Sequence, residues 1–254
     1  MLLGVVMPVY NERELLPRII ARLDATPRPQ GPDGLQVTRH LFIVDDGSTD
    51  GTADLLPDYD RREDITALTA DRNRGKGSAL RRGFAAALER GCDVVIVQDA
   101  DLEYDPADHR TVLAPILDGR ADAVIGTRFL GQTHRVLYYW HAVVNRAITA
   151  LSNMLSNLNL TDIECGTKAF TRPVLAAILP SLREDRFGIE PELVARLARL
   201  RLPPAGGPGG APRPIRIYEV PVSYAGRTYA EGKKIGWRDG LEAVRCILQH
   251  NLLG

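Results

Sequence analysis

Short apolar runs alternate with amphipathic stretches over the first half of this chain of 254 residues. Apolar runs of about four to eight residues between turn residues are typical of buried strands, and apolar positions every three or four residues are typical of helices. The alternation favours an α/β fold with a mostly parallel, Rossmann-like sheet and helices on both faces. The patterns predict strands at residues 2–7, 40–44, 65–69, 93–97 and 121–126, and helices at residues 13–24, 52–60, 76–89 and 106–118.

The second half of the chain contains a long amphipathic pattern at residues 136–158, with apolar residues on one side and amide and hydroxyl side chains on the other. Such a helix usually packs its apolar side on the core. The alternative is a helix at a lipid interface, which the lack of lysine on the polar side disfavours. Further patterns predict helices at residues 189–200 and 237–248, an interrupted strand at 215–224 and a Gly/Pro-rich surface loop at 203–214.

Composition and charge exclude several classes of protein. The chain has 32 Lys and Arg against 32 Asp and Glu, and this zero net charge gives no bulk attraction to nucleic acid or anionic lipid. Three widely spaced cysteines, Cys92, Cys165 and Cys246, fit neither a zinc site nor a disulfide framework and favour a reducing compartment. No apolar run approaches the roughly 18 residues of a membrane-spanning helix, and the N-terminus lacks a signal-peptide pattern. We therefore expect a cytoplasmic protein that at most touches a membrane surface.

Three polar clusters follow three of the predicted strands, at residues 8–12, 45–50 and 99–103. In parallel α/β sheets, ligands bind at the carboxyl ends of the strands. Because all three clusters fall at such ends, they predict one shared binding site rather than three unrelated turns.

Asp99 and Asp101 stand one residue apart at the exit of the apolar run 94–97. Like charges at this spacing raise each other's pKa unless a cation lies between them. A divalent cation removes that repulsion and also binds a diphosphate. An EF-hand calcium loop is excluded, because Tyr104 occupies the position of its required glycine. The pair therefore favours a metal site for a nucleotide diphosphate over an acidic surface turn.

The segments 45–50 and 73–78 each have a structural and a functional interpretation. The first can be a turn at Gly47 followed by helix-capping residues, but the carboxylate of Asp46 can also accept the ring N–H of uracil or guanine. The second is a Gly-rich turn before a helix and departs from a Walker A loop. Free amides at that helix start, beside Lys76, would nevertheless suit an anion.

Two charged segments of the second half also have two interpretations. The segment 227–234 contains several basic residues and a single acid, Glu231. Such a charged segment is typical of a solvated loop, but also of a clamp on phosphate oxygens. Glu190 and Glu192 lie in the first turn of a predicted helix, where acids stabilise the helix dipole. Either of them could instead act as a general base.

The ordered motifs are residues 8–12 (PVYNE), 44–48 (VDDGS), 73–77 (NRGKG) and 99–101 (DAD). Together they resemble the inverting family 2 glycosyltransferases of the GT-A fold. Residues 162–170 (DIECGTKAF) and 227–233 (RTYAEGK) point within that family to the polyprenyl-phosphate sugar synthases, such as the dolichyl-phosphate mannose synthases. The resemblance covers nearly the whole chain, so we expect one GT-A domain over residues 1–254.

The resemblance implies roles for individual residues. Residues 1–130 would form the nucleotide-sugar-binding half of the domain, and residues 131–254 would form the acceptor half and a closing loop. Mg²⁺ or Mn²⁺ would be held by Asp99, Asp101 and Glu103, although relatives often carry glutamine at the position of Glu103. The donor site would be formed by Pro8, Tyr10, Glu12, Asp46, Lys76, Asp99, Ala100 and Asp101. The catalytic residues would be Asp101, Glu190 and the phosphate-binding Arg227 and Lys233.

The implied reaction is inverting transfer of a hexose from a nucleotide diphosphate sugar, of the GDP-mannose or UDP-glucose type, to a polyprenyl or dolichyl phosphate. The partners would be that donor and a lipid phosphate at a membrane surface, and no nucleic acid is expected. The helix at residues 136–158 would lie beside the acceptor. Three alternatives stay open: transfer to a sugar or other hydroxyl with a carboxylate as general base, a sugar nucleotidyltransferase, and a nucleotide-sugar-binding protein.

Overall fold

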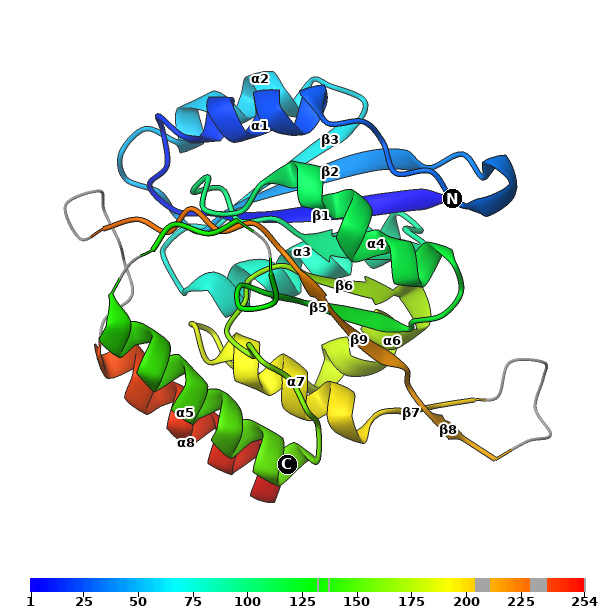
Figure 1. Cartoon of the computed structure of the whole chain (residues 1–254). Coiled ribbons are helices and arrows are strands. Elements are labelled where there is room, and N and C mark those ends of the chain that lie inside the picture. The colour runs from blue at the N-terminus through cyan, green and yellow to red at the C-terminus, as the bar shows by residue number, and fades with distance from the viewer. Residues whose placement is uncertain (132, 137, 204–210, 229–236, 254) are drawn as a thin grey trace.

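The computed structural model describes residues 1–131, 133–136, 138–203, 211–228 and 237–253. A sheet of seven strands crosses this part of the chain in the order β3-β2-β1-β4-β6-β5-β9 (Figure 1). β6 runs antiparallel to its neighbours β4 and β5, and all other neighbouring strands run parallel. The strands are β1 (Leu2–Val9), β2 (Thr38–Asp45), β3 (Ile65–Thr69), β4 (Val94–Val97), β5 (Ala123–Thr127), β6 (Lys168–Thr171) and β9 (Ile217–Pro221).

Helices cover both faces of the sheet, as the alternating pattern predicts (Figure 1). One face carries α1 (Leu16–Ala25), α2 (Leu56–Asp60) and α4 (His109–Leu117). The other carries α3 (Lys76–Glu89), α6 (Arg172–Ile178) and α7 (Ile189–Arg199), with α5 (Tyr139–Ser156) and α8 (Trp237–Leu252) packed against α7 and each other. Single 3-10 turns occur at Pro32–Gly34, Ala53–Leu55, Pro106–Asp108 and Leu179–Ser181.

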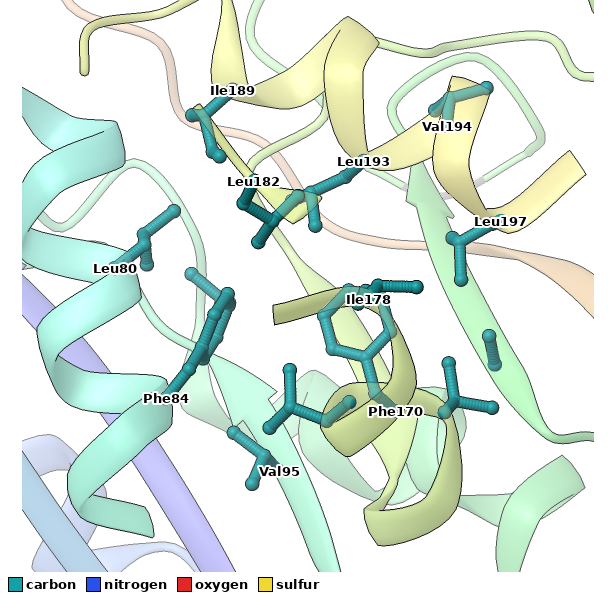
Figure 2. Packing of buried hydrophobic residues seen from close by; sticks show 14 of the residues in the cluster. Leu80, Phe84, Val95, Phe170, Ile178, Leu182, Ile189, Leu193, Val194 and Leu197 are labelled. Carbon is teal, nitrogen blue, oxygen red and sulfur yellow. The ribbon is translucent and has the colours of Figure 1, made fainter. Parts of the chain in front are cut away.

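The core under α3, α6 and α7 joins the two halves of the chain. Figure 2 shows Phe84 of α3 facing Phe170 of β6, with Leu193 of α7 above them. The two aromatic rings meet edge to face, with their centroids 5.9 Å apart, a favourable geometry for their quadrupoles. Burial of these side chains away from water holds α3 and α7 on the same face of the sheet.

The start of α3 is positioned by two glycines that allow close packing. A Cβ atom on Gly83 would lie 2.4 Å from Cγ1 of Val6 in β1, and one on Gly77 would lie 2.2 Å from the backbone oxygen of Glu184. Any larger side chain would push the helix away from the sheet or from the segment before α7. Both glycines therefore place Lys76, the first residue of α3, at the carboxyl edge of the sheet.

The predicted strands and helices of the first half are confirmed, with small shifts at their ends. β6 and α6 were not predicted, because a strand of four residues gives too little alternation to read. Of the loop predicted at 203–214, residues 204–210 lie outside the described part. Its last two residues are strand rather than loop, because β8 (Arg213–Pro214) pairs antiparallel with β7 (Arg201–Leu202), which lies just before the predicted loop.

The prediction that α5 packs its apolar side on the core is confirmed for the later part of that side, where Ile148 is buried and Leu151, Leu155 and Leu158 pack against the core. It is wrong for the start, where Trp140 and Val144 are 72% and 50% exposed. On the polar side, Thr149 and Ser152 are buried. The polar side faces inward because the neighbouring segment 160–163 offers hydrogen bonds to it. Leu160, for example, exchanges two of these bonds with the side-chain amide of Asn153.

The three cysteines carry free thiols and are buried. Among the described residues, no helix combines the length and the apolar character needed to cross a bilayer.

Candidate active site

The loop that follows β4 carries the acidic residues predicted to bind a cation. The side-chain amide of Gln98 closes this loop by donating to the backbone oxygens of Asp99 and Tyr104, at 3.1 Å each. Nε2 of His109 lies 2.8 Å from the side-chain oxygen of the same glutamine. Leu102 has a φ of 63°, which is rare for a residue with a branched apolar side chain and is typical of functional loops.

Arg227 lies among the acids of this loop. Its guanidinium is 3.1 Å from Asp101, 3.4 Å from Glu103 and 3.5 Å from Glu12 at the end of β1. The backbone N–H of Arg227 also donates to Glu103 at 2.9 Å. The structure thus brings Glu12, Asp101, Glu103 and Arg227 together, as the resemblance implies for donor and phosphate binding.

The clustering of acids perturbs Asp101. Burial, and then the charges of Asp99 and Glu103, raise the pKa of Asp101 to about 7, although Arg227 opposes the shift. A cation between the carboxylates would remove this repulsion. Carboxylate oxygens are also the ligands that Mg²⁺ and Mn²⁺ prefer.

Positive groups already lie among these oxygens, with Arg227 beside Asp101 and Glu103 and Lys76 beside Asp99. Asp99, Asp101 and Glu103 therefore fit a divalent cation. Glu103 is the most engaged of the three. Its carboxylate accepts from the backbone of Arg227 and, at 2.9 Å, from the hydroxyl of Tyr224.

Lys76 and Glu190 form a buried network of ion pairs with Asp99. The ammonium of Lys76 lies 2.9 Å from Asp99 and 3.0 Å from Glu190, and Glu190 also pairs with the fully buried Lys168 of β6. Although burial acts to raise it, Lys168 and Lys76 hold the pKa of Glu190 below its ordinary value. A carboxylate held ionised by two ammonium groups is a poor proton acceptor. The network therefore favours a positioning role for Glu190, which holds Lys76 in place. It disfavours the predicted role of Glu190 as a general base.

The two acids at the end of β2, Asp45 within the strand and Asp46 just after it, hold backbone turns. Asp45 accepts the N–H groups of Gly47 and Ser48 at 3.2 Å each. Asp46 accepts those of Arg74 and Gly75, at 3.0 Å and 2.6 Å. Asp46 thus attaches the Gly-rich turn before α3 to the end of β2. Its predicted bond to the nucleobase stays a prediction.

The end of β1 is interlocked with the turn after β2. The N–H of Asn11 donates to Ser48, and the N–H of Glu12 donates to Thr52, at 2.9 Å and 3.0 Å. Pro8 and Tyr10, predicted to line the nucleoside pocket, lie half-buried on the same stretch. The common edge predicted for the clusters 8–12, 45–50 and 99–103 is therefore confirmed.

The remaining predicted residues have different outcomes. The methyl group of Ala100 is buried in the core, so any contact with a donor would fall to its backbone. Lys233 lies outside the described residues, as does most of the basic segment 227–234.

Arg128 was not singled out from the sequence. It follows β5 at the same edge of the sheet and pairs with the buried Asp162 through two hydrogen bonds of 2.6 Å and 2.8 Å. Its guanidinium also lies 5.1 Å from the ring centre of Tyr224, whose hydroxyl donates to Glu103. The sequence offered one signal for Arg128. It lies just after a predicted strand and has no acidic residue next to it in the chain.

Comparison with known proteins identifies the family. The profile of Glycosyl transferase family 2 matches residues 4–179. An undecaprenyl-phosphate mannosyltransferase of Micrococcus luteus is 31% identical, over 97% of this chain and 93% of that protein. A polyprenol monophosphomannose synthase of Mycolicibacterium smegmatis is 34% identical over 68% of this chain and 63% of that protein. The chain therefore belongs to glycosyltransferase family 2.

Solved structures support the GT-A fold. Glucosyl-3-phosphoglycerate synthase from Mycobacterium tuberculosis, in complex with Mn²⁺, UDP and phosphoglyceric acid, matches with a TM-score of 0.68 at 20% identity. The match covers 99% of this chain and 79% of that chain. Another structure of the same synthase contains Mg²⁺ and UDP. The predicted fold class is confirmed.

The first prediction concerns Arg227. Replacement Arg227→Gln is expected to tighten Mn²⁺ binding about tenfold in the absence of nucleotide, because guanidinium and metal compete for the same carboxylate oxygens. Titration with Mn²⁺ followed by electron paramagnetic resonance measures the affinity.

Two variants serve as controls for this measurement. Arg227→Lys keeps the positive charge and should bind Mn²⁺ much as the original chain does. Arg120→Gln removes the same charge from a surface pair with Asp118 and should change the affinity less than twofold. Unchanged or weaker binding by Arg227→Gln would contradict the competition.

The second prediction concerns acid sensitivity of the loop after β4. Burial lowers the pKa of His109 to about 3, whereas in the unfolded chain it is about 6.5. Between these values only the unfolded chain takes up the proton, so stability falls as the pH drops below 6.5, by up to about 1.4 kcal/mol per pH unit. Replacement His109→Asn keeps a donor for Gln98 but does not titrate.

Urea unfolding at pH 7 and pH 5 tests this prediction. The loss of unfolding free energy between the two pH values should be smaller in His109→Asn than in the original chain, by about 1–2 kcal/mol. His141→Asn, at an exposed position of α5, should keep the original pH dependence. The idea fails if His109→Asn loses as much stability as the original chain.

Proposed function

We propose that this glycosyltransferase moves a hexose from a nucleotide diphosphate sugar, of the GDP-mannose or UDP-glucose type, to a polyprenyl or dolichyl phosphate, with inversion and with Mg²⁺ or Mn²⁺. The observation that carries the proposal is the acidic cluster after β4, in direct contact with the cationic groups of Arg227 and Lys76. The names of the two relatives given above, both polyprenyl-phosphate mannose enzymes, support the acceptor class.

Departure of the nucleoside diphosphate is the step that this site is built to assist. A bound divalent cation, held by Asp99, Asp101 and Glu103, would neutralise charge on the diphosphate. Lys76, at the N-terminus of α3, and Arg227 bring further positive charge to the same edge of the sheet. Charge aimed at the leaving group lowers the barrier to breaking the anomeric bond. Residues 1–130 supply most of these donor-side groups, which is consistent with their role as the nucleotide-sugar half.

The candidate general bases favour a phosphate acceptor. Asp162 is fully buried and paired with Arg128, and Glu190 lies between two lysines. Glu192, also fully buried, accepts the backbone N–H of Arg183 at 2.9 Å.

None of these three carboxylates is available to take a proton from a hydroxyl acceptor. A phosphate monoester, whose second pKa is about 6, is already anionic at neutral pH and needs no base. Membership of family 2 likewise disfavours the nucleotidyltransferase and binding-protein alternatives.

The third prediction tests donor, cation and acceptor together. Purified protein is incubated with radiolabelled GDP-mannose or UDP-glucose, Mn²⁺, and either a short-chain prenyl phosphate or the matching prenol. Transfer is expected to the phosphate and not to the alcohol, with complete loss in excess chelator. Replacement Asp101→Asn should lower turnover at least a hundredfold, whereas Asp118→Asn, on the surface, should leave it unchanged.

Two results would contradict the proposed reaction. Equal transfer to prenol and prenyl phosphate would favour a hydroxyl acceptor. Absence of transfer from either donor, with Mn²⁺ and with chelator alike, would remove the proposal altogether.

A further inference from the structure

Glu164 has a buried carboxylate oxygen that the described part of the chain leaves unpaired. This residue belongs to the segment 162–168, which leads from the end of α5 to the start of β6. Its Oε1 atom is shielded from solvent and has no hydrogen-bond partner among the described residues. A buried polar atom without a partner costs free energy, so it requires a physical explanation such as a bound group or a chemical role.

The backbone that carries Glu164 is held firmly in place. Ile163 and Cys165, on either side of it, are fully buried in the core. Their backbone oxygens accept from the ammonium of Lys168 at 3.2 Å and 2.5 Å. The unpaired oxygen is therefore carried by a fixed turn rather than by a loose loop.

The segment 162–168 lies against the acidic cluster. A Cβ atom on Gly166 would lie only 2.4 Å from Oδ2 of Asp99. Towards the other end of the segment, Asp162 pairs with Arg128. Glu164 thus stands midway between a residue that touches the predicted metal ligand and a residue that binds the guanidinium after β5.

The charges around Glu164 place its carboxylate inside the site. Burial raises its pKa to about 7, and the charge of Glu190 acts in the same direction, whereas Lys168 and Arg128 oppose the shift. Charges are felt most strongly over a few ångströms, so the carboxylate lies within reach of both the Glu190 network and Arg128. Groups that donate hydrogen bonds to this carboxylate would stabilise its charged form.

The order of the strands gives a donor one direction across the site. β4 carries the acidic cluster at its carboxyl end and lies between β1 and β6. The nucleoside is predicted on the β1 side, beside Pro8 and Asp46. Because β6 runs antiparallel to β4, the start of β6, with Glu164 just before it, lies at the same edge of the sheet. A diphosphate bound at β4 would therefore direct the hexose towards Glu164.

The chemistry of the unpaired oxygen fits the hexose better than the other parts of the substrates. A carboxylate oxygen accepts hydrogen bonds and repels anions. The diphosphate and the acceptor phosphate are both anionic, and neither supplies the donors that Glu164 lacks. The hexose is neutral, and its hydroxyl groups are hydrogen-bond donors.

We propose that Glu164 binds hydroxyl groups of the donor hexose and thereby helps to select the sugar. This role rests on the proposed function, because it requires a nucleotide diphosphate sugar as donor. It does not depend on the acceptor. Glu164 removes no proton in this role, since a phosphate acceptor needs no base.

The fourth prediction compares the complete donor with its nucleoside diphosphate. Glu164→Ala should weaken binding of GDP-mannose or UDP-glucose, whichever the original chain binds, about thirtyfold, because charge-assisted hydrogen bonds are lost. The same variant should bind GDP or UDP within twofold of the original chain, because these ligands lack the hexose. Isothermal titration calorimetry with Mn²⁺ measures both affinities.

Two further variants complete the comparison. Glu164→Gln keeps an acceptor oxygen of the same reach, so it should bind the donor within about fivefold of the original chain and still transfer the hexose. Glu89→Ala removes an exposed carboxylate at the far end of α3 and should change neither affinity. Because Glu164→Ala removes an unpaired buried group, its melting temperature should not fall.

Three results would overturn the role of Glu164. Equal weakening of donor and diphosphate by Glu164→Ala would mean that the residue supports the site as a whole. Unchanged donor affinity would mean that it contacts only water. Loss of transfer by Glu164→Gln with intact donor affinity would make it a general base.

These results can be told apart from failure of the proposed function. The first two leave that function standing, because the original chain still binds the donor. Absence of donor binding by the original chain would remove both proposals. Selective weakening by Glu164→Ala in a chain that transfers nothing to prenyl phosphate would support the role of Glu164 and refute the proposed acceptor.

Discussion

The balance of charge at the carboxyl edge of the sheet is the constraint on which the site depends. Glu12, Asp99, Asp101 and Glu103 gather where β1 and β4 end, and each lies within ion-pairing distance of a cationic group. A partly buried acidic cluster without such partners would cost several kcal/mol or take up protons. Lysine and arginine side chains therefore offset the negative charge that a metal ion would otherwise neutralise.

The partners of these acids come from distant parts of the chain, which couples the site to the whole fold. Lys76 begins α3, and its second partner Glu190 begins α7. Glu190 in turn pairs with Lys168 of β6, the antiparallel strand between β4 and β5. This network joins α3 to β6 and α7 of the second half. Movement of any of these elements would therefore change the ion pair between Lys76 and Asp99.

The same principle, that buried polar groups must be paired, explains the orientation of α5. Asn145, Thr149 and Asn153 find partners in the segment 160–163. These polar residues face inward beside the buried Ile148, whereas Trp140 and Val144 at the start of the helix are exposed. Hydrophobic periodicity predicts that a helix has two sides, but it does not tell which side the protein will cover. Hydrogen bonds to the segment 160–163 and burial of Ile148 together fix the orientation here, although the buried hydroxyl of Ser152 has no hydrogen-bond partner among the described residues.

The sequence by itself determined the α/β class, the first-half strands and helices, and the meeting of three polar clusters at one edge, because strand periodicity is local and parallel strands share a carboxyl end. The family motifs also marked Asp99, Asp101 and Arg227. Only the tertiary structure decided that β6 enters the sheet, that Arg128 pairs with Asp162 and that Glu190 lies between two lysines. Those contacts join residues that are not neighbours in the chain, 34 positions apart for Arg128 and Asp162 and 22 for Lys168 and Glu190. No local pattern encodes which distant side chain will complete a buried charge.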